Sequence, residues 1–459
     1  MFATWIPVEA KKKYDYSSES WFINYSLGCG TNKDYLLYNF DAKVLSKSVK
    51  EMVDFYNEQR TEFIKNNLSK KSAKDFVKYD SQKIAWTDLF LKDLEKNVIY
   101  NFDKSKISIA SYRPFCKQNF MYEKQFLQRS YQQLKIFPTP THKNLVIRVT
   151  GLNERKGFAT LISDCIPDLN NFDGGTQCFP LYWYEEAPSD MDLFQSAGIA
   201  ESKYIRHDAV SDFILNRAQT KYGNKVTKED LFYYVYGILH SKSYRQKFAD
   251  DLKKMLPRIP LVSDWGKFWA FSKAGRELAK LHLDYESVPP CADVKIESLK
   301  QAIYKMPETK YESKYGELVA AEPSHSERSE ESIDVSPLAQ HDTDYEYYAV
   351  EQMKFADKDK KDSIVYNHWH TITNIPPKAY EYVINGQSAI EHVMEWYGMK
   401  KWNAQSKKSG SGIVNNPNDW SREHQKPRYI LDLLLSVINV SVQTVDIVDA
   451  LPEVDWEKE

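Results

Sequence analysis

The stretch from Thr227 to Pro260 constrains the fold more than any other, because its apolar residues recur at three- and four-residue spacing. Its first part, TKEDLFYYVYGILH, places Thr227 three residues before Asp230, a capping-box pattern with Asp in place of the usual Glu or Gln. A helix is therefore predicted from this point, ending near residue 240. Gly237 lies inside it, where the missing side chain allows close packing against a neighbour.

The second part of the stretch predicts another helix, from about Ser243 to Met255. It must end there because Pro257 and Pro260 cannot continue it. The two helices are expected to form a pair whose apolar stripes are buried. The basic residues of the stretch lie toward its second half: Arg245, Lys253, Lys254 and Arg258.

The remaining chain alternates between apolar runs typical of strands and segments with helical spacing. Strands are predicted within 96–123, with a turn at Arg113 and Pro114, and within 144–149, 158–166, 176–184 and a hairpin over 345–373. Further helices are predicted after Asp41, after the capping box SAIE at Ser388, and from about Pro427. The predicted fold class is mixed α+β or α/β, with strands and packed helix pairs in several layers.

A chain of 459 residues exceeds one ordinary hydrophobic core, so two to three domains are expected. We divide it into an N-terminal segment with strands and a long helix, a main region with the helix pair, a polar insertion or linker, and a C-terminal part with a hairpin and helices. These are residues 1–105, 106–308, 309–345 and 346–459. The third is rich in Ser and Glu and too poor in apolar groups to fold by itself.

Composition excludes several classes of protein. The N-terminus lacks the apolar core of a signal peptide, and no run of about 18 apolar residues predicts a membrane span. The five cysteines are odd in number and widely spaced, which indicates neither a disulfide framework nor a zinc site and favours a cytoplasmic location. His368 and His370 could share a strand face, but no further ligand cluster supports a metal. The net charge is −2, so any surface for nucleic acid must be a local patch.

Catalytic motifs are largely absent. The chain has no P-loop, no G-x-S-x-G, no H-E-x-x-H and no N-P-P-Y loop. The turn SLGCGT at 26–31 suggests one alternative, an S-adenosylmethionine-dependent DNA methyltransferase in which Gly28 and Gly30 allow close approach of the cofactor. Against it, Asn32 replaces the third small residue, and the following YLLYNF is predicted to be a strand.

A set of longer motifs in fixed order resembles the C-terminal specificity region of type ISP restriction-modification enzymes. These motifs are YRPF, QCFPLYWY, EDLFYYVYGILHSKSYRQKFADDLKKMLPRIP, AGRELAKLHLDYE, IPPKAYEYVINGQSAIEHVMEWY and SGIVNNPNDW. The segment GCGTNKDYLLYNF also resembles the part that follows the methyltransferase in those proteins, so its glycines need not belong to a cofactor turn. The resemblance covers nearly the whole chain except the insertion.

In that family, one polypeptide carries a nuclease, an ATP-driven translocase, an adenine methyltransferase and then this region. The resemblance therefore implies a bacterial module that binds double-stranded DNA sequence-specifically. It is expected to be a fragment, split subunit or gene remnant without catalysis or cofactor of its own. The S-adenosylmethionine, ATP and Mg of the parent enzymes would belong to the other parts. A further alternative is a scaffold that docks to separately encoded methyltransferase, helicase or nuclease subunits.

A DNA-binding module needs cations to contact phosphates and amide or guanidinium groups to contact base edges. The family provides no assignment of base-contacting residues, so the candidates come from side-chain chemistry alone. They are Asn32, Lys33, Arg113, Gln177, Arg245, Lys253, Lys254 and Arg258.

Overall fold

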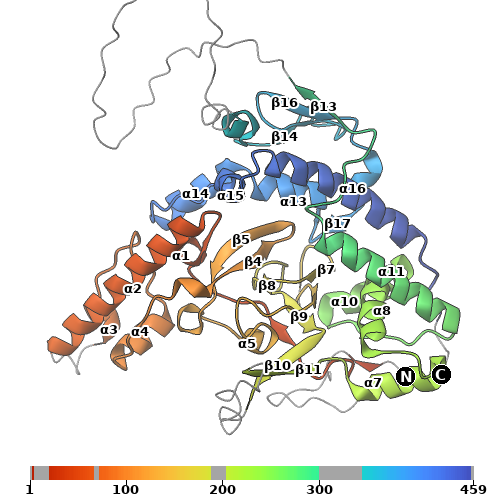
Figure 1. Ribbon diagram of the computed structural model, residues 1–459, viewed down its shortest axis with the longest axis horizontal. Helices are drawn as coiled ribbons and strands as arrows, with labels where there is room; N and C mark the ends of the chain where they lie inside the picture. Colours follow the sequence, from red (N-terminus) through yellow and green to blue (C-terminus); the bar gives the residue numbers. More distant parts are fainter. Residues whose placement is uncertain are drawn as a thin grey trace, which may run out of the picture.

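The computed structural model describes residues 3–4, 20–66, 72–152, 154–187, 203–298 and 344–455. Within these ranges small sheets occupy the middle of the molecule and helices flank them (Figure 1). This arrangement confirms the predicted mixed α and β class.

Two four-stranded sheets form the centre. The first is antiparallel and has the order β2 (Ser26–Leu27), β9 (Gln177–Pro180), β6 (Val146–Val149), β7 (Thr160–Ser163). The second has the order β3 (Tyr38–Asn39), β5 (Cys116–Met121), β4 (Ile107–Arg113), β8 (Ile166–Pro167), and only its β4–β8 pair is parallel. The predicted strands of 96–123, 144–149, 158–166 and 176–184 are thus confirmed. The turn between β4 and β5 lies at Pro114 and Phe115, one residue later than predicted, because Arg113 still pairs with Cys116.

A third sheet and three ribbons lie around this centre. The sheet has the order β13 (Lys295–Ser298), β16 (His370–Thr373), β15 (Ile364–Val365), β14 (Lys354–Phe355). Its β14–β15 pair confirms the predicted hairpin only in part. Residues 344–348 of the first predicted strand are helical, and the second half of the hairpin folds into two strands rather than one. The ribbons are β1 (Ala3–Thr4) with β12 (Arg258–Ile259), β10 (Tyr182–Glu186) with β11 (Tyr204–Asp208), and β17 (Val383–Ile384) with β18 (Gln387–Ser388).

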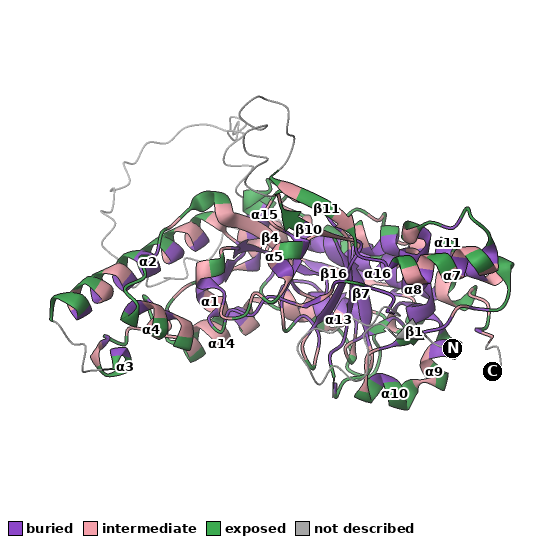
Figure 2. Ribbon diagram, turned by 90° about the horizontal axis from the view of Figure 1, so that it is seen from below, coloured by how far each residue is buried: buried purple, intermediate pink, exposed green. Residues whose placement is uncertain are grey.

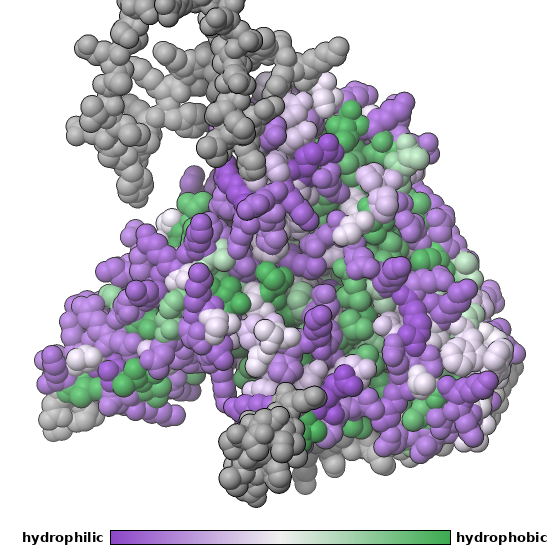
Figure 3. Space-filling view, in the orientation of Figure 1, coloured by the Kyte–Doolittle hydropathy of each residue, from purple (hydrophilic) through white to green (hydrophobic). Residues whose placement is uncertain are grey.

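The N-terminal helices form an arm at one side of the molecule. They are α1 (Asp34–Leu37), α2 (Ala42–Lys65), α3 (Ala73–Phe76) and α4 (Asp88–Glu95). Asp41 caps α2 as predicted, because its carboxylate accepts from the amides of Lys43 and Val44. One face of α2 is buried and the other is exposed (Figure 2), and the arm is mainly hydrophilic in Figure 3. The strand predicted for YLLYNF is partly wrong, because its first three residues complete α1.

The predicted helix at Thr227 is confirmed as α8 (Lys228–His240), with the capping box between Thr227 and Asp230 formed in both directions. The second predicted helix is instead two short ones, α9 (Lys242–Lys247) and α10 (Ala249–Lys254), which meet at Phe248. The main partner of α8 is α11 (Trp265–Leu283), far along the chain. Gly237 explains this contact, since a Cβ atom there would lie 2.2 Å from the Phe271 carbonyl oxygen of α11.

Other helices complete the layers. They are α5 (Gln133–Ile136), α7 (Asp212–Tyr222), α13 (Ala389–Trp396), α14 (Met399–Ser409), α15 (Pro417–Glu423), α16 (Tyr429–Asp449) and the 3-10 turns at Lys104–Lys106, Lys124–Phe126 and Pro377–Tyr380. The capping box predicted at Ser388 starts α13, and the last predicted helix is α16. Among the described helices, α16 alone is long and apolar enough to cross a membrane, but 67% of its most apolar window is buried inside the protein. It packs against α11 and α13 like a core helix.

Hydrophobic packing does not follow the predicted boundary at residue 105. One buried cluster joins α2 and the second central sheet to the C-terminal helices. The other joins the first central sheet to α8 and α11. The four-part division of the chain stays a prediction. Its linker, 309–345, lies outside the described residues except for its last two positions.

Candidate functional site

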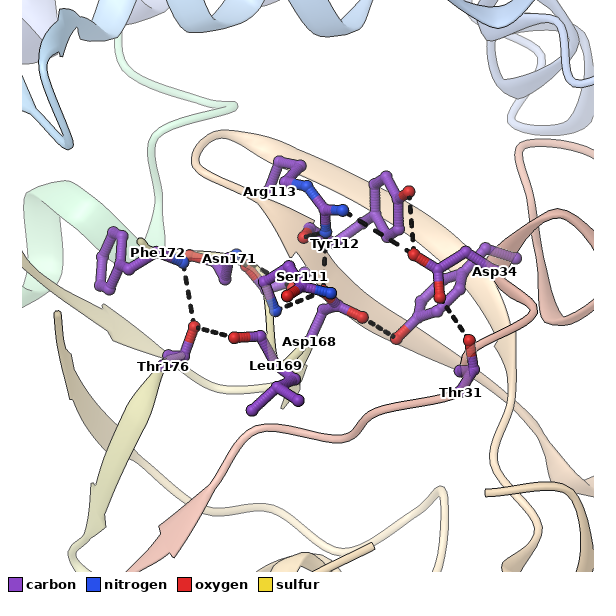
Figure 4. Close-up of polar contacts among 12 residues, drawn as sticks. Thr31, Asp34, Ser111, Tyr112, Arg113, Asp168, Leu169, Asn171, Phe172 and Thr176 are labelled. Carbon is purple, nitrogen blue, oxygen red and sulfur yellow. Dashed lines mark hydrogen bonds and ion pairs between the residues drawn. The ribbon is translucent and has the colours of Figure 1, made fainter. Parts of the chain in front are cut away.

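A buried polar network joins three segments that are distant in sequence: 31–34, 111–113 and 168–176 (Figure 4). At its centre the Arg113 guanidinium contacts the Asp168 carboxylate at 2.7 Å and lies 3.8 Å from the Asp34 carboxylate. The side chain of Asp168 is fully buried, while that of Arg113 is 13% exposed. The guanidinium also stacks on Tyr112, 3.8 Å from the ring centroid. Arg113 therefore ties the β4–β5 turn to the loop after β8.

Asp168 is held from several sides. Its carboxylate accepts from the Tyr38 hydroxyl at 3.1 Å and from the Asn170 amide at 2.8 Å. Burial raises the pKa of Asp168 to about 7, although Arg113 acts in the opposite direction, and the nearby Asp34 carboxylate adds to the rise. The fold thus buries a carboxyl group with a raised pKa at the start of the 168–176 loop.

A second cation, Arg148, supports Ser111, the residue to which this loop is bonded. Arg148 of β6 is only 4% exposed, and it donates to the Ser111 hydroxyl at 2.7 Å and the Ile162 carbonyl at 3.0 Å. Asn171 donates to the Ser111 carbonyl at 3.0 Å. Thr176 closes the loop by donating to the Leu169 carbonyl (Figure 4). The loop therefore has a rigid base, which is what an exposed recognition loop requires.

Above this base lies an open, mainly polar pocket of about 260 Å³, which we call the polar pocket. Its lining combines three cations, several amides, two carboxylates and two aromatic rings. Those residues are Arg113, Lys156, Lys401, Asn170, Asn171, Asn385, Gln387, Asp173, Glu395, Phe172 and Trp396, together with His392. They come from the β4–β5 turn, the β6–β7 connection, the 168–176 loop, the β17–β18 ribbon and the α13–α14 corner.

Two buried acceptors at the polar pocket have no hydrogen-bond partner. They are Oδ1 of Asn171 and Nδ1 of His392, whose Nε2 faces the Ile384 carbonyl at 2.8 Å. Buried polar groups are normally paired with protein or ordered water.

Four of the eight predicted DNA-contacting residues are engaged inside the protein. Lys33 is 1% exposed, lies 4.1 Å from the Phe90 ring centroid, and has its pKa lowered to about 7 by burial. Gln177 is 8% exposed and belongs to β9. Arg245 donates to the Leu239 carbonyl at 2.6 Å, and Arg113 is held by the network above. The geometry does not favour Lys33, Gln177 or Arg245 as DNA contacts.

The other four predicted residues are exposed. Asn32 lies in a turn with φ of 57°. Lys253, Lys254 and Arg258 lie at the end of α10 and in β12, and Lys253 is paired with Asp250 at 3.4 Å. Of the eight, the structure brings only Arg113 to the polar pocket.

The SLGCGT turn does not fit S-adenosylmethionine. A Cβ atom at Gly28 would lie 2.5 Å from the Asp168 carbonyl oxygen, so the glycine accommodates the chain's own backbone. The amides of Gly28, Cys29 and Gly30 all donate to backbone carbonyls, at 2.8 to 3.0 Å. The described part of the chain contains no group of three His, Cys, Asp or Glu placed to hold a metal, and Nδ1 of His370 shares a hydrogen bond with Ser298.

A family model described as the Type ISP C-terminal specificity domain matches residues 20–433. The chain belongs to this family. Two solved structures are each 30% identical to it with a TM-score of 0.73: the ATP-dependent Type ISP restriction-modification enzyme LlaBIII bound to DNA, and a nuclease-deletion mutant of the Type ISP enzyme LlaGI with a DNA substrate mimic. They match 99% and 100% of this chain and 24% and 34% of their own chains.

A third solved structure, a DrdV–DNA complex, shows the same fold at 24% identity and a TM-score of 0.73, over 99% of this chain and 38% of its own. The specificity domain thus spans about a quarter to two-fifths of the length of these proteins. Among curated proteins, none matches the chain. The resemblance inferred from the motifs is confirmed.

Sequence reasoning missed most of the polar pocket of this specificity domain. Lys156, Asn170 and Gln387 stand in unremarkable polar turns, and Lys401 lies in an ordinary basic helix. In the sequence, Asn385–Gly386 indicates a turn and nothing more. The available signals were the polar turns NNFDGG and ING, but nothing in their spacing shows that they meet.

The network predicts a pH dependence of stability. The pKa of Asp168 is higher in the folded specificity domain than the ordinary value of 3.8, so the folded state holds the proton more tightly than the unfolded state. Its contribution is fully present below about pH 4 and is lost as pH rises toward 7. Asp168→Asn should therefore flatten the fall in unfolding free energy between these pH values, measured by urea titration. An unchanged pH profile would show that Asp168 is ionised throughout.

Proposed function

We propose that this specificity domain recognises a defined sequence in double-stranded DNA, and that the polar pocket is the part that contacts base edges. The observation that carries the proposal is that several side-chain amides lie together in the polar pocket, on and beside a loop with a rigid base. Asn170 is exposed on that loop, and Gln387 lines the same pocket from the β17–β18 ribbon. Asn385 of the ribbon links it to the loop, because its Oδ1 accepts from the Asp173 amide at 3.0 Å. Asn and Gln amides pair with both groups of an adenine edge in the major groove.

The charges in the polar pocket support the same function. Asp173 is paired with Arg155 at 3.2 Å, and Glu395 is paired with Lys401. Arg113 is paired with Asp168, so its role is to position the loop. Lys156 is exposed and makes no ion pair with another described residue, so it can approach a phosphate. DNA-bound relatives of the same family make duplex DNA the natural ligand.

The proposed module acts in the cytoplasm of a bacterial cell. It would direct a methyltransferase, a helicase-like translocase and a nuclease to one site, whether these are joined to it or separately encoded. A pure docking scaffold is the competing hypothesis. It predicts no DNA preference and leaves the amide-rich lining of the polar pocket without a role.

The test begins with selection of preferred sites from a random duplex library by the full chain. Affinities for the selected duplex and a scrambled duplex are then compared for the parent, Asn170→Ala and Gln387→Ala. Each substitution should weaken binding to the selected duplex by about 1–3 kcal/mol while leaving the scrambled duplex unaffected. Asn216→Ala, at an exposed position of α7, is the matched control and should bind like the parent.

Two outcomes would contradict the proposal. The library selection could enrich no sequence, which would favour the docking scaffold. Alternatively, Asn170→Ala and Gln387→Ala could keep the full preference of the parent, which would place base recognition elsewhere on the domain.

A further inference from the structure

We infer that α14 is the phosphate-binding element that holds the DNA backbone beside the polar pocket. This inference rests on the proposed function and adds where the backbone runs. The helix sequence MKKWNAQSKKS contains four lysines and no acidic residue. Lys400, Lys407 and Lys408 are exposed, and none of them makes an ion pair with another described residue.

The helix continues directly from the polar pocket. Lys401, in its first turn, lines the pocket and lies 3.3 Å from the centroid of the Trp396 ring. Lys408 is seven residues further on, which places it on the same side of the helix about 10 Å away along the axis. Lys400 and Lys407 are also seven residues apart, so they too lie on one side of the helix. The exposed lysines therefore extend along α14 away from the edge of the polar pocket, while Lys401 at that edge is paired with Glu395.

The protein holds α14 in place at both ends. Trp402 is 2% exposed and donates from its indole to the Trp396 carbonyl at 2.8 Å, and its ring contacts Phe40 and Tyr112. At the other end, the Ser81 hydroxyl donates to the Gly410 carbonyl at 3.1 Å. The lysines are thus presented on a fixed helix, so little ordering of the backbone is needed when DNA binds.

The basic cluster predicted from the sequence, Lys253, Lys254 and Arg258, has a different electrostatic setting. Helix α10 carries Asp250 and Asp251 as well as its two lysines, so its own charges cancel. It also lies well apart from α14 in both Figure 1 and Figure 2. Counterion release depends on cations that neutralise phosphates, and acidic neighbours oppose it. The α14 lysines are therefore the stronger phosphate contacts.

The experiment compares two triple variants of the full chain, each lacking three cations. One is Lys400→Ala/Lys407→Ala/Lys408→Ala, and the other is Lys253→Ala/Lys254→Ala/Arg258→Ala. Fluorescence anisotropy with a random-sequence duplex, over a salt series from about 50 to 200 mM, gives the slope of log K against log salt. The α14 variant should lose about three units of slope, roughly 0.9 for each contact, and the α10 variant should keep the parent slope.

A second measurement separates this inference from the proposed function. The α14 variant should bind the selected and scrambled duplexes more weakly by the same factor, because phosphates carry no sequence information. The inference is overturned if the α14 variant keeps the parent slope, or if the α10 variant alone loses slope. Recognition by the polar pocket would survive either result, provided that Asn170→Ala still loses the sequence preference. If the parent chain binds no duplex, both the inference and the proposed function fall.

Discussion

Replacing Arg113 with alanine is expected to lower the free energy of unfolding by about 3 kcal/mol or more. The reason is that two carboxylates, Asp168 and Asp34, lose the cation that lies between them. Without the guanidinium, the buried Asp168 carboxylate must either stay unpaired or take up a proton, and either change costs more than losing an exposed pair. The guanidinium also leaves its stacked positions on Tyr112 and Trp396. Urea denaturation at neutral pH measures the loss.

Arg155→Ala is the matched control for this experiment. Arg155 also pairs with an aspartate, Asp173, at 3.2 Å, but its side chain is 85% exposed. Exposed pairs contribute little to stability. The control should therefore unfold at the same urea concentration as the parent. Equal losses for Arg113→Ala and Arg155→Ala would show that the buried network does not hold the fold together.

Gly275→Ala is expected to destabilise the chain by about 3 kcal/mol, through overpacking between two helices. A Cβ atom at Gly275 of α11 would lie 1.9 Å from the Tyr233 carbonyl oxygen and 3.0 Å from the Gly237 amide nitrogen, both in α8. Because these are backbone atoms of α8, the clash can be relieved only if the two helices move apart. Thermal unfolding followed by circular dichroism should show a clear drop in the melting temperature.

Gly266→Ala provides the control in the same helix. Its Cβ atom would meet only the end of the Asp264 side chain, at 2.9 Å, so at most the N-cap bond from the Lys267 amide is disturbed. Alanine also has the higher helix propensity, so the change in stability should stay within about 1 kcal/mol. A melting temperature that falls equally for both variants would contradict the account of the α8–α11 contact.

Local features of the fold could be predicted from the sequence because short-range physics determines them. The Thr227–Asp230 and Ser388–Glu391 capping boxes and the Asp41 cap each involve residues within three positions. The strand runs were found for a similar reason, since β-branched and aromatic residues are concentrated between turns. The resemblance of the longer motifs to Type ISP specificity regions then indicated the family to which the chain belongs.

Tertiary contacts could not be predicted in this way. The partner of α8 is α11 and not the next helix, because Gly237 and Gly275 face each other across about 40 residues. Lys33 looks like an exposed turn lysine in the sequence, yet it packs over Phe90. The polar pocket is missed for the same reason, since its amides come from loops more than 200 residues apart. Exposure of a charged side chain depends on which distant segment covers it.

The most direct measurement of the central claim is a structure of this chain bound to its selected duplex. The account predicts that a side-chain amide of Asn170 or Gln387 lies within about 2.7–3.2 Å of a base-edge atom. It also predicts that the DNA backbone runs along α14. A complex in which the polar pocket faces solvent and the bases are contacted from another surface would contradict it.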